Sequence, residues 1–352
     1  MDFTFSEDQR NLRDAMRDFL AVETRAELQR KRWETPEGRS DELWQQFAAQ
    51  GLTGLSAPEA AGGLDMGDLD WALMAQELGY FGVDDSVVDT CWLAVAMLCD
   101  LAHDHPLRRE WLEKIAAGQA RVAIGHPVNP LVADAHVAQL LLLSHEGELH
   151  AVTPAAVKLN AQESVDLSRR LFEVDWQPTA ATRVLDAASA APLWQAALNR
   201  GALAAAAQML GLTKRMLDMA VSYTAERKQF GKPLGSFQAV KHLLADVAVK
   251  LEFSRPVVFR AAYALAHGQA AAATCVSHAK AVATEASWLA AKNCMQVHGA
   301  MGYTWEVDLQ LFMKRAWALG GAWGDRAFHK HRLGEFVLRR QAQHGPGTTF
   351  AY

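Results

Sequence analysis

Two short segments of the chain combine residue types that could bind a phosphate and a flat aromatic group. The first segment, residues 226–234, contains Arg227 and Phe230 and is stopped by Gly231 and Pro233. A guanidinium can hold a phosphate through paired hydrogen bonds, and a phenyl ring offers a flat apolar face. Without further context, the same residues would serve as an ordinary turn between two helices that carries surface charges.

The second segment, residues 296–303, contains Gln296, Gly299 and Gly302 between two stretches of helical periodicity. Glycines let a backbone approach another chain or a ligand closely, and they allow backbone conformations that other residues avoid. An ordinary helix connection is the simpler interpretation of this segment taken alone. Both segments therefore become informative only through the elements that position them.

Long alanine-rich helices are predicted to carry both segments. Apolar residues recur at helical spacing over four stretches, 192–225, 236–267, 269–298 and 306–340. Each stretch exceeds the usual length of a helix in a globular protein, about 11–12 residues, which favours a bundle of long antiparallel helices. The first segment then joins the first two helices, and the second segment joins the last two.

The rest of the chain is predicted to form a helical domain followed by a small β domain. Residues 1–118 show helical periodicity, opened by a capping box in which Ser6 and Gln9 satisfy the first backbone amides of a helix. Residues 119–188 hold short apolar runs separated by turn residues, typical of four to six strands. We therefore expect three domains and a flexible tail: 1–118, 119–188, 189–340 and 341–352.

The composition excludes several classes of protein. The 352 residues contain 35 basic and 40 acidic side chains, a net charge of −5, and no basic stripe of the kind that binds nucleic acid. The four cysteines form no Cys-x-x-Cys pair, which argues against a zinc site and a disulfide framework. Neither a signal peptide nor a bilayer-spanning apolar stretch is visible. We expect a cytoplasmic protein that binds no metal, nucleic acid or membrane.

Taken together, the two segments resemble the acyl-CoA dehydrogenase family. Arg227 and Phe230-Gly231 match the family's Arg-x-x-Phe-Gly segment, and residues 296–302 match its Gln-x-x-Gly-Gly-x-Gly segment, with Ala300 in place of the middle glycine. Three stretches nearer the amino terminus are also similar to the family: Leu55-x-x-Pro58-Glu59, Gly62-Gly63-Leu64 and Ala75-Gln76-Glu77-Leu78-Gly79. The resemblance implies a mostly helical fold with a small central β domain, in the order helical domain, β domain, four-helix bundle.

That resemblance also implies an FAD-dependent oxidoreductase that oxidises acyl-CoA thioesters between Cα and Cβ. In the family, a carboxylate removes the α proton while the β hydrogen leaves as a hydride to the flavin. Members share their FAD across a subunit interface, and both segments reach the adenine and pyrophosphate end of a neighbour's FAD. Carried over to this chain, the FAD-binding positions are Arg227, Phe230, Gln296, Gly299 and Gly302.

The chain departs from the family at the catalytic base. The family's Tyr-Glu-Gly-Thr segment corresponds to the sequence GAWGD, which puts Trp323 at the position of the glutamate. The earlier position that a minority of members use for the base falls near Gly201. Neither residue can accept a proton, so no catalytic residue is assigned. Asp325 is either a displaced base or a solvent-facing, helix-capping residue. His329 and His331 are two residues apart, on different helix faces, and are expected at the surface.

A second departure lies in the β domain. Residues 123–128 stand where the family's Thr-Glu-Pro segment hydrogen-bonds the flavin ring, and no counterpart of its Trp-Ile-Thr-Asn segment is visible. By this comparison the chain lacks its own cradle for the flavin ring, while it keeps the residues that serve a neighbour's FAD.

These features favour the non-catalytic subunit of a heteromeric acyl-CoA dehydrogenase. The resemblance implies a catalytic acyl-CoA dehydrogenase subunit as partner, in an α2β2 heterotetramer of the steroid side-chain type that shares FAD across its α–β interfaces. The substrate would be an acyl-CoA, such as a steroid side-chain thioester, and an electron-transfer flavoprotein would accept the electrons. Two alternatives stay open: a self-sufficient homomeric dehydrogenase with a displaced base, and a flavin-free structural homologue.

Overall fold

The computed structural model describes residues 4–339, which form two compact units assembled from segments far apart in the sequence. The unit called here the bundle unit is made of the described parts of Met1–Thr24, Asp68–Val83 and Ala202–Tyr352. The other, called the strand unit, is made of Arg25–Gly67 and Asp84–Gly201. The division into three consecutive domains stays a prediction, and the predicted tail, 341–352, lies outside the described residues.

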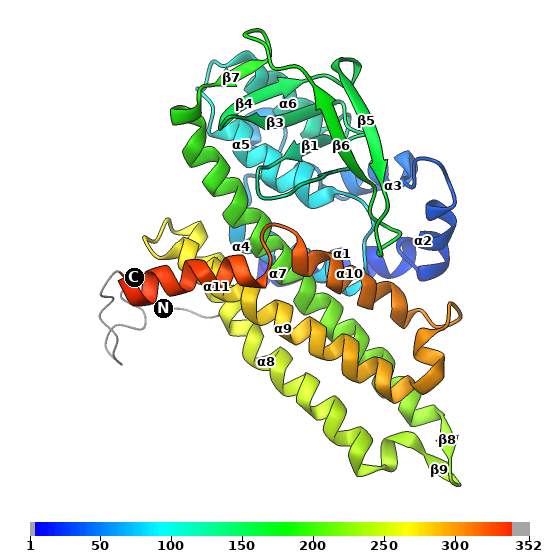
Figure 1. Ribbon diagram of the computed structural model, residues 1–352. Coiled ribbons are helices and arrows are strands. Elements are labelled where there is room, and N and C mark those ends of the chain that lie inside the picture. The colour runs from blue at the N-terminus through cyan, green and yellow to red at the C-terminus, as the bar shows by residue number, and fades with distance from the viewer. Residues whose placement is uncertain (1–3, 340–352) are drawn as a thin grey trace. The chain divides into compact units, whose positions relative to one another are not determined.

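Helices make up most of the bundle unit (Figure 1). Its longer elements are α1 Glu7–Glu23, α4 Asp68–Tyr80, the second part of α7 Ala187–Glu226, α8 Gln238–Ala266, α9 Ala272–His298, α10 Leu309–Gly321 and α11 Arg326–Gly334. Its shorter elements are the strands β8 Lys228–Gln229 and β9 Lys232–Pro233 and the helical turns η4 Leu234–Ser236, η5 Gly299–Tyr303 and η6 Glu335–Arg339. Within the described residues, no helix is both long enough and apolar enough to span a membrane.

The capping box predicted for the first helix is confirmed. Gln9 N donates to Ser6 Oγ at 3.1 Å, and Ser6 N donates to Gln9 Oε1 at 3.0 Å. Two backbone amides that the helix leaves without partners are thereby satisfied, and α1 begins at the next residue, Glu7.

Two glycines let α4 and α7 cross in close contact. A Cβ atom at Gly79 would lie 2.1 Å from Gln208 O, and a Cβ atom at Gly211 would lie 2.0 Å from Gln76 O. Distances this short leave no room for any side chain. The glycine that closes the stretch 75–79 is therefore required by the packing of one helix on another.

The prediction of one continuous helix over 306–340 is wrong. Helix α10 ends at Gly321 and α11 begins at Arg326, because Trp323 and Gly324 have positive φ angles of 56° and 88°. A positive φ takes the backbone out of the right-handed helix. The apolar spacing continues on both sides of the break and so conceals it. The other three long helices are present as α7, α8 and α9.

The strand unit combines short helices with two small sheets. Its helical elements are α2 Ala26–Trp33, α3 Asp41–Ala49, η1 Glu59–Ala61, η2 Asp89–Ala94, α5 Val95–Cys99, α6 Pro106–Ala116, η3 Pro154–Ala156 and the first part of α7. Its strands are β1 Val122–Gly125, β2 Val132–Ala133, β3 Leu140–His145, β4 Glu148–Val152, β5 Val157–Gln162, β6 Leu171–Trp176 and β7 Arg183–Leu185. The described chain thus has seven strands here where four to six were predicted. The two- and three-residue strands β2 and β7 are too short to show a periodic signal.

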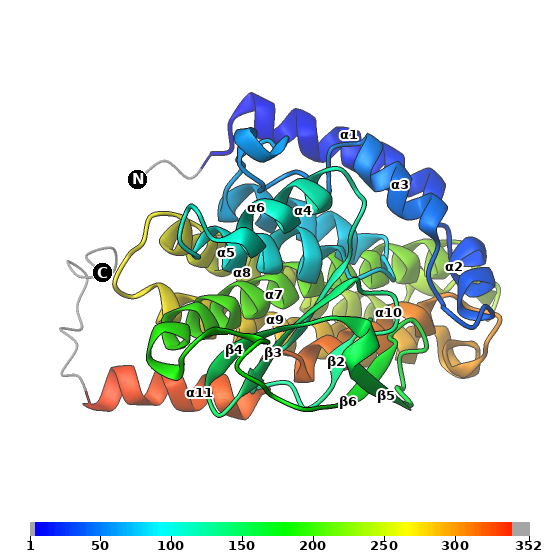
Figure 2. The ribbon, with the colours of Figure 1, turned by 90° about the horizontal axis from the view of Figure 1, so that it is seen from above.

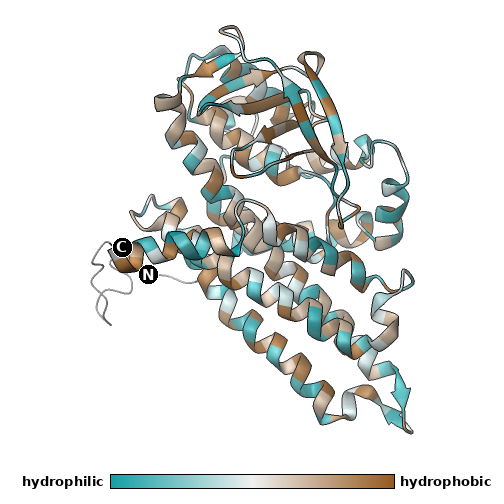
Figure 3. Ribbon diagram, in the orientation of Figure 1, coloured by the Kyte–Doolittle hydropathy of each residue, from teal (hydrophilic) through white to brown (hydrophobic). Residues whose placement is uncertain are grey.

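The two sheets pack around an apolar core. One sheet has the order β1-β3-β4-β7, in which only β1 and β3 run parallel, and the other has the order β2-β6-β5 and is antiparallel. Figure 2 shows β3 beside β4 and β6 beside β5. Strand β3 is hydrophobic along most of its length (Figure 3), and Leu141 and Leu143 meet Val152 and Phe172 in the core. The predicted fold class, mostly helical with a small β domain, is confirmed.

Candidate functional site

A tight hairpin carries the first predicted segment beyond the end of α7. Strands β8 and β9 pair antiparallel, and Leu234 N donates to Arg227 O at 2.8 Å, which closes the loop. At the tip, Phe230 and Gly231 have φ angles of 52° and 77°. Positive φ at both central residues gives a turn whose twist matches that of the flanking strands. Glycine adopts this conformation freely, whereas a bulky aromatic residue rarely does.

The side chains of this hairpin point into solvent. Phe230 is 90% exposed, and its ring meets Phe237 edge-on with centroids 6.1 Å apart. The two strands are hydrophilic (Figure 3), and Lys232 Nζ lies 4.4 Å from the Phe237 ring centroid. The exposed Arg227 guanidinium makes no hydrogen bond or ion pair with any residue of the described range 4–339. One short hairpin therefore carries both an unpaired cation and an exposed phenyl ring.

The second predicted segment follows α9. Gln296 is exposed in the last turn of α9, and its backbone oxygen accepts a hydrogen bond from the backbone N–H of Gly299. Gly299 has a φ of 63°, and a Cβ atom there would meet nothing within 4 Å, so backbone conformation is what requires glycine. Gly302 differs, because a Cβ atom there would lie 2.9 Å from Met295 O. Packing inside the chain is enough to explain Gly302.

A stacked pair of rings brings the two segments together at one end of the bundle unit (Figure 1). Tyr223 in the last turn of α7 and His298 at the end of α9 stack with ring centroids 4.3 Å apart. Tyr223 O accepts a hydrogen bond from Arg227 N at 2.9 Å, so the pair lies at the base of the hairpin. His298 Nδ1 donates to Cys294 O at 2.7 Å, and burial lowers the pKa of His298, which keeps the ring neutral near pH 7.

Tyr223 and His298 were not among the predicted site residues. Both lie next to predicted positions, with Tyr223 four residues before Arg227 and His298 directly before Gly299. An aromatic residue near the end of each helix was the available signal. A single sequence could not show that the two residues belong to one contact.

The turn between α10 and α11 contains Trp323, the first of the two positions at which the family resemblance predicts a base. Trp323 is 8% exposed, and Asp325 Oδ1 accepts a hydrogen bond from Phe328 N at 2.8 Å, which caps α11. The carboxylate of Asp325 thus has the exposed, helix-capping place that was one of its two predicted roles. Gly201, the second position, is a buried residue in the middle of α7.

The expectation that His329 lies at the surface is wrong. His329 is fully buried: its Nε2 donates to Trp323 O at 2.9 Å, and its Nδ1 accepts from Ser277 Oγ at 3.2 Å. Burial lowers the pKa of His329 to about 4, so the ring is neutral at physiological pH. His331, by contrast, is exposed as predicted. The break between α10 and α11 turns the His329 side of the short helix toward α9, which the sequence alone did not indicate.

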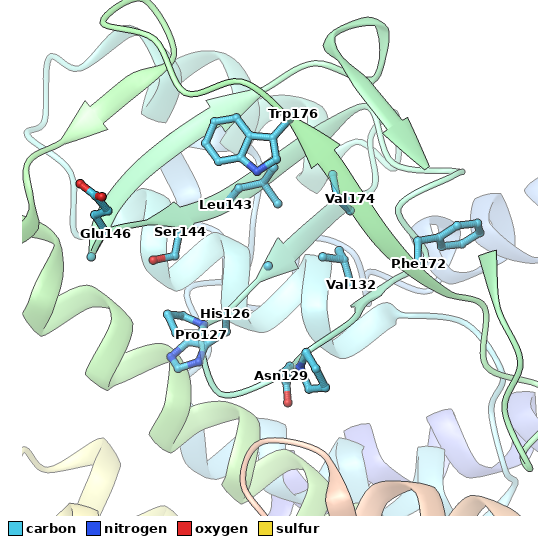
Figure 4. A pocket seen from close by; sticks show the side chains of 13 residues that line it. His126, Pro127, Asn129, Val132, Leu143, Ser144, Glu146, Phe172, Val174 and Trp176 are labelled. Carbon is cyan, nitrogen blue, oxygen red and sulfur yellow. The ribbon is translucent and has the colours of Figure 1, made fainter. Parts of the chain in front are cut away.

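A cavity of about 460 Å³ lies in the strand unit beside the segment 123–128 (Figure 4). Its polar lining side chains are His126, Asn129, Ser144 and Glu146, and its apolar ones include Val132, Leu143, Phe172, Val174 and Trp176. His126 Nε2 donates to Trp194 O at 2.9 Å, and its Nδ1 accepts from Val128 N at 3.0 Å. Both ring nitrogens are therefore engaged, and burial lowers the pKa of His126. Because both ring nitrogens are hydrogen-bonded to the backbone, His126 has no free nitrogen with which to take a proton from a substrate.

The described residues fit the adenine and pyrophosphate end of an FAD better than its flavin ring. The hairpin and the end of α9 offer an unpaired guanidinium, an exposed phenyl ring and an exposed amide, which suit a phosphate and a flat aromatic group. The cavity in the strand unit offers the Ser144 hydroxyl and the Asn129 amide, while its imidazole is already satisfied. Among the described residues, no group of three His, Cys, Asp or Glu side chains could hold a metal ion.

Known proteins resemble the chain along most of its length. Residues 6–119 match the family model of the acyl-CoA dehydrogenase N-terminal domain, and residues 191–338 match the model of the acyl-CoA dehydrogenase C-terminal domain. The chain is 31% identical to the acyl-CoA dehydrogenase IpdE2 of Mycolicibacterium smegmatis, over 88% of this chain and 93% of that protein. The IpdE2 of Mycobacterium tuberculosis is 29% identical over 88% of this chain and 91% of its own length.

Solved structures share the fold. A chain of the ChsE4–ChsE5 complex from Mycobacterium tuberculosis superposes with a TM-score of 0.86 at 23% identity, covering 96% of this chain and 99% of that chain. A chain of the Tcur3481–Tcur3483 steroid ACAD superposes with a TM-score of 0.81 at 21% identity, covering 94% and 98%. The chain therefore belongs to the acyl-CoA dehydrogenase family and is, by homology, related to FAD-dependent oxidoreductases.

Proposed function

We propose that this chain is the non-catalytic subunit of a heteromeric acyl-CoA dehydrogenase and binds the adenine and pyrophosphate end of an FAD shared with a catalytic partner. One observation carries the proposal. Phe230 stands 90% exposed at the hairpin tip in a backbone conformation that aromatic residues avoid, on the same short hairpin as the unpaired guanidinium of Arg227. Nothing in the described chain itself uses this arrangement, so a group from outside it is the natural occupant.

Four of the five predicted FAD-binding residues have distinct roles in this proposal, whereas packing against Met295 explains Gly302. Arg227 holds a phosphate through charge-assisted hydrogen bonds, since no carboxylate of the described chain competes for its guanidinium. Phe230 supplies a flat apolar face for the adenine side, and the exposed amide of Gln296 supplies a donor and an acceptor. Gly299 keeps the backbone open at the end of α9. Bound FAD supplies the hydride acceptor for the oxidation of the thioester.

The base for that oxidation must come from the partner. Trp323 and Gly201 carry no proton acceptor, and the Asp325 carboxylate already caps α11. The His126 imidazole beside the strand-unit cavity is fully engaged. These observations disfavour the self-sufficient homomeric enzyme with Asp325 as its base. The unpaired Arg227 and exposed Phe230 disfavour a structural homologue that has lost flavin, because such a chain has no use for them.

The relatives suggest the class of substrate and the form of the assembly. ChsE4 and ChsE5 were solved as a complex, and Tcur3481–Tcur3483 is a two-part steroid ACAD. By analogy, we propose an α2β2 heterotetramer with a catalytic acyl-CoA dehydrogenase subunit, a steroid side-chain acyl-CoA as substrate and an electron-transfer flavoprotein as electron acceptor.

Coexpression with a catalytic acyl-CoA dehydrogenase encoded beside this chain tests the proposal. Flavin absorbance is expected in the purified complex and not in this chain purified alone. Arg227→Ala in the complex should weaken FAD binding about 10- to 100-fold, because charge-assisted hydrogen bonds to a phosphate are lost. Lys228→Ala is the matched control, because Lys228 is the adjacent exposed cation and should leave FAD binding within about twofold.

Two outcomes would overturn the proposal. One is stoichiometric FAD in the chain purified alone, together with bleaching of that FAD by an acyl-CoA. The other is equal loss of FAD from the Arg227→Ala and Lys228→Ala complexes, which would point to a general effect of surface charge and not to a phosphate contact.

A further inference from the structure

A buried lysine lies beneath the turn between α10 and α11. Lys280, on α9, is fully buried, and its Nζ donates to three backbone oxygens: Leu319 O at 2.9 Å, Gly320 O at 3.0 Å and Gly324 O at 3.2 Å. The first two carbonyls belong to the last turn of α10, and the third belongs to the turn itself. A single nitrogen atom thus joins both sides of the break in the helix.

The chemistry of this contact is specific to an ammonium group. The last carbonyls of a helix have no partner within the helix, and here they converge on one point with a carbonyl from beyond its end. An ammonium has three donors on one atom and no acceptor, so it can satisfy three converging carbonyls at once. Its positive charge also suits the negative end of the α10 dipole. Within residues 4–339 no carboxylate hydrogen-bonds Lys280, and the charge of Asp325 favours the ammonium without contacting it.

A second contact holds the other side of the turn. His329, on α11, donates to Trp323 O at 2.9 Å and accepts from Ser277 Oγ at 3.2 Å. Ser277 lies on α9 one turn before Lys280. Helix α9 therefore holds the turn at Trp323 and Gly324 from two neighbouring positions. Both residues have positive φ angles, and such conformations persist only where surrounding contacts impose them.

We infer that Lys280 is a positioning residue: its ammonium sets the break between α10 and α11 and thereby holds Trp323 in its buried, left-handed position. His329 and Ser277 secure the same turn from the side of α11. The inference rests on the proposed function only for the functional consequence of holding Trp323, which occupies the position at which the family resemblance predicts a base. Under that proposal, Lys280 keeps the base position of this chain filled by a fixed indole.

Hydrogen exchange and NMR on the chain alone test the inference. Lys280→Met keeps a similar length and removes all three donors. We expect the hydrogen-bonded amides on either side of the turn, those of Ala322, Phe328 and His329, to lose protection about 100-fold, while amides in the middle of α9 change less than about threefold. The indole N–H resonance of Trp323, assigned by its absence in Trp323→Phe, should shift or broaden. Lys292→Met, at an exposed lysine of the same helix, is the matched control and should change neither signal.

A direct measurement covers the case in which Lys280→Met does not fold. At a pH below 7, where Lys280 is an ammonium with three donors in the folded chain, 15N-labelled Lys280 in the unaltered chain should show couplings across hydrogen bonds to the carbonyl carbons of Leu319, Gly320 and Gly324. Absence of these couplings would overturn the inference. Unchanged protection of the amides of Ala322, Phe328 and His329 in a folded Lys280→Met chain, or an equal loss along all of α9, would do the same. Neither FAD nor a partner enters these experiments, so their outcome is independent of the test of the proposed function.

Discussion

The hairpin tip and the α10–α11 turn share one backbone conformation but differ in how far their aromatic residue is exposed. In each, an aromatic residue with a φ near 50–60° precedes a glycine with a positive φ: Phe230 with Gly231, and Trp323 with Gly324. Phe230 is 90% exposed and Trp323 is 8% exposed. At the turn, Lys280 and His329 donate hydrogen bonds to backbone oxygens, whereas at the hairpin tip the Phe230 ring meets one ring of the described chain, that of Phe237.

The two aromatic residues differ in what surrounds their left-handed backbone. Where the surrounding chain imposes the conformation, as at Trp323, the strain is explained by the fold. At Phe230 the two-residue hairpin turn requires the positive φ, but nothing in the described chain requires an exposed aromatic ring at that position, and the choice of phenylalanine therefore supports the proposal of a ligand or partner. We therefore expect Trp323 to contribute to stability, and the exposure of Phe230 supports its proposed role in binding.

The largest expected effect separates the two residues by stability. Trp323→Ala should lower the free energy of unfolding of the chain by about 3–5 kcal/mol, because removing a large buried side chain leaves a cavity. Phe230→Ala should change it by less than about 0.5 kcal/mol, because little of the ring is buried. Urea unfolding followed by circular dichroism measures both. Similar losses at the two positions would show that the hairpin tip is part of the core, and the comparison would fail.

The second expected effect is a pH dependence of the free energy of unfolding that arises at the α10–α11 turn and not at the hairpin tip. Burial lowers the pKa of Lys280 from 10.5 to about 7. Between those values the unfolded chain binds a proton that the folded chain does not, so stability should rise as pH increases from 7 toward 10. The limit for one group is about 1.4 kcal/mol per pH unit. Urea unfolding at several pH values measures the slope.

Two variants show whether that slope belongs to Lys280. The slope should shrink in Lys280→Met, which has no group to titrate there, and it should be unchanged in Phe230→Ala. A slope of equal size in Lys280→Met would place the titrating group elsewhere in the chain.

The third expected effect concerns FAD binding, in which Phe230 and not Trp323 should matter more. In the complex with a catalytic partner, Phe230→Ala should weaken FAD binding about tenfold, which corresponds to about 1.4 kcal/mol, through loss of an apolar face. Phe230→Leu, which keeps apolar volume but loses the flat ring, distinguishes ring stacking from simple burial. Titration of the flavin-free complex with FAD measures both variants. Full binding by Phe230→Ala would leave the exposed ring unexplained by the proposed function.

The sequence predicted local features well and tertiary ones poorly. The capping box at Ser6 and Gln9 depends on residues three apart, and the long helices α7 to α9 depend on continuous periodicity, so both could be predicted. The break at Trp323 depends on Lys280, which is more than forty residues away in the chain and was not singled out. The same contact network buries His329 and makes its predicted surface location wrong.

In the candidate site, too, single residues could be predicted from the sequence but the contact between them could not. Arg227, Phe230 and Gln296 were predicted through a family resemblance, and the structure places them at one end of the bundle unit. The contact that brings them together, Tyr223 on His298, joins two helix ends that no local pattern relates. Their role toward FAD stays a prediction, because it depends on a partner that the chain by itself does not contain.

The smallest expected effect tests the strain itself at the exposed tip. Asparagine tolerates positive φ better than phenylalanine does, and relief of a left-handed conformation is worth about 0.5–1 kcal/mol. Phe230→Asn should therefore raise the free energy of unfolding slightly, while Gly231→Ala, which adds a Cβ atom at a φ of 77°, should lower it by about 1 kcal/mol. If Phe230→Asn stabilises the chain while it weakens FAD binding in the complex, the phenylalanine is kept at a cost to stability for the sake of a ligand. If it destabilises the chain, Phe230 contributes to the fold through Phe237, and its exposure no longer argues for a binding role.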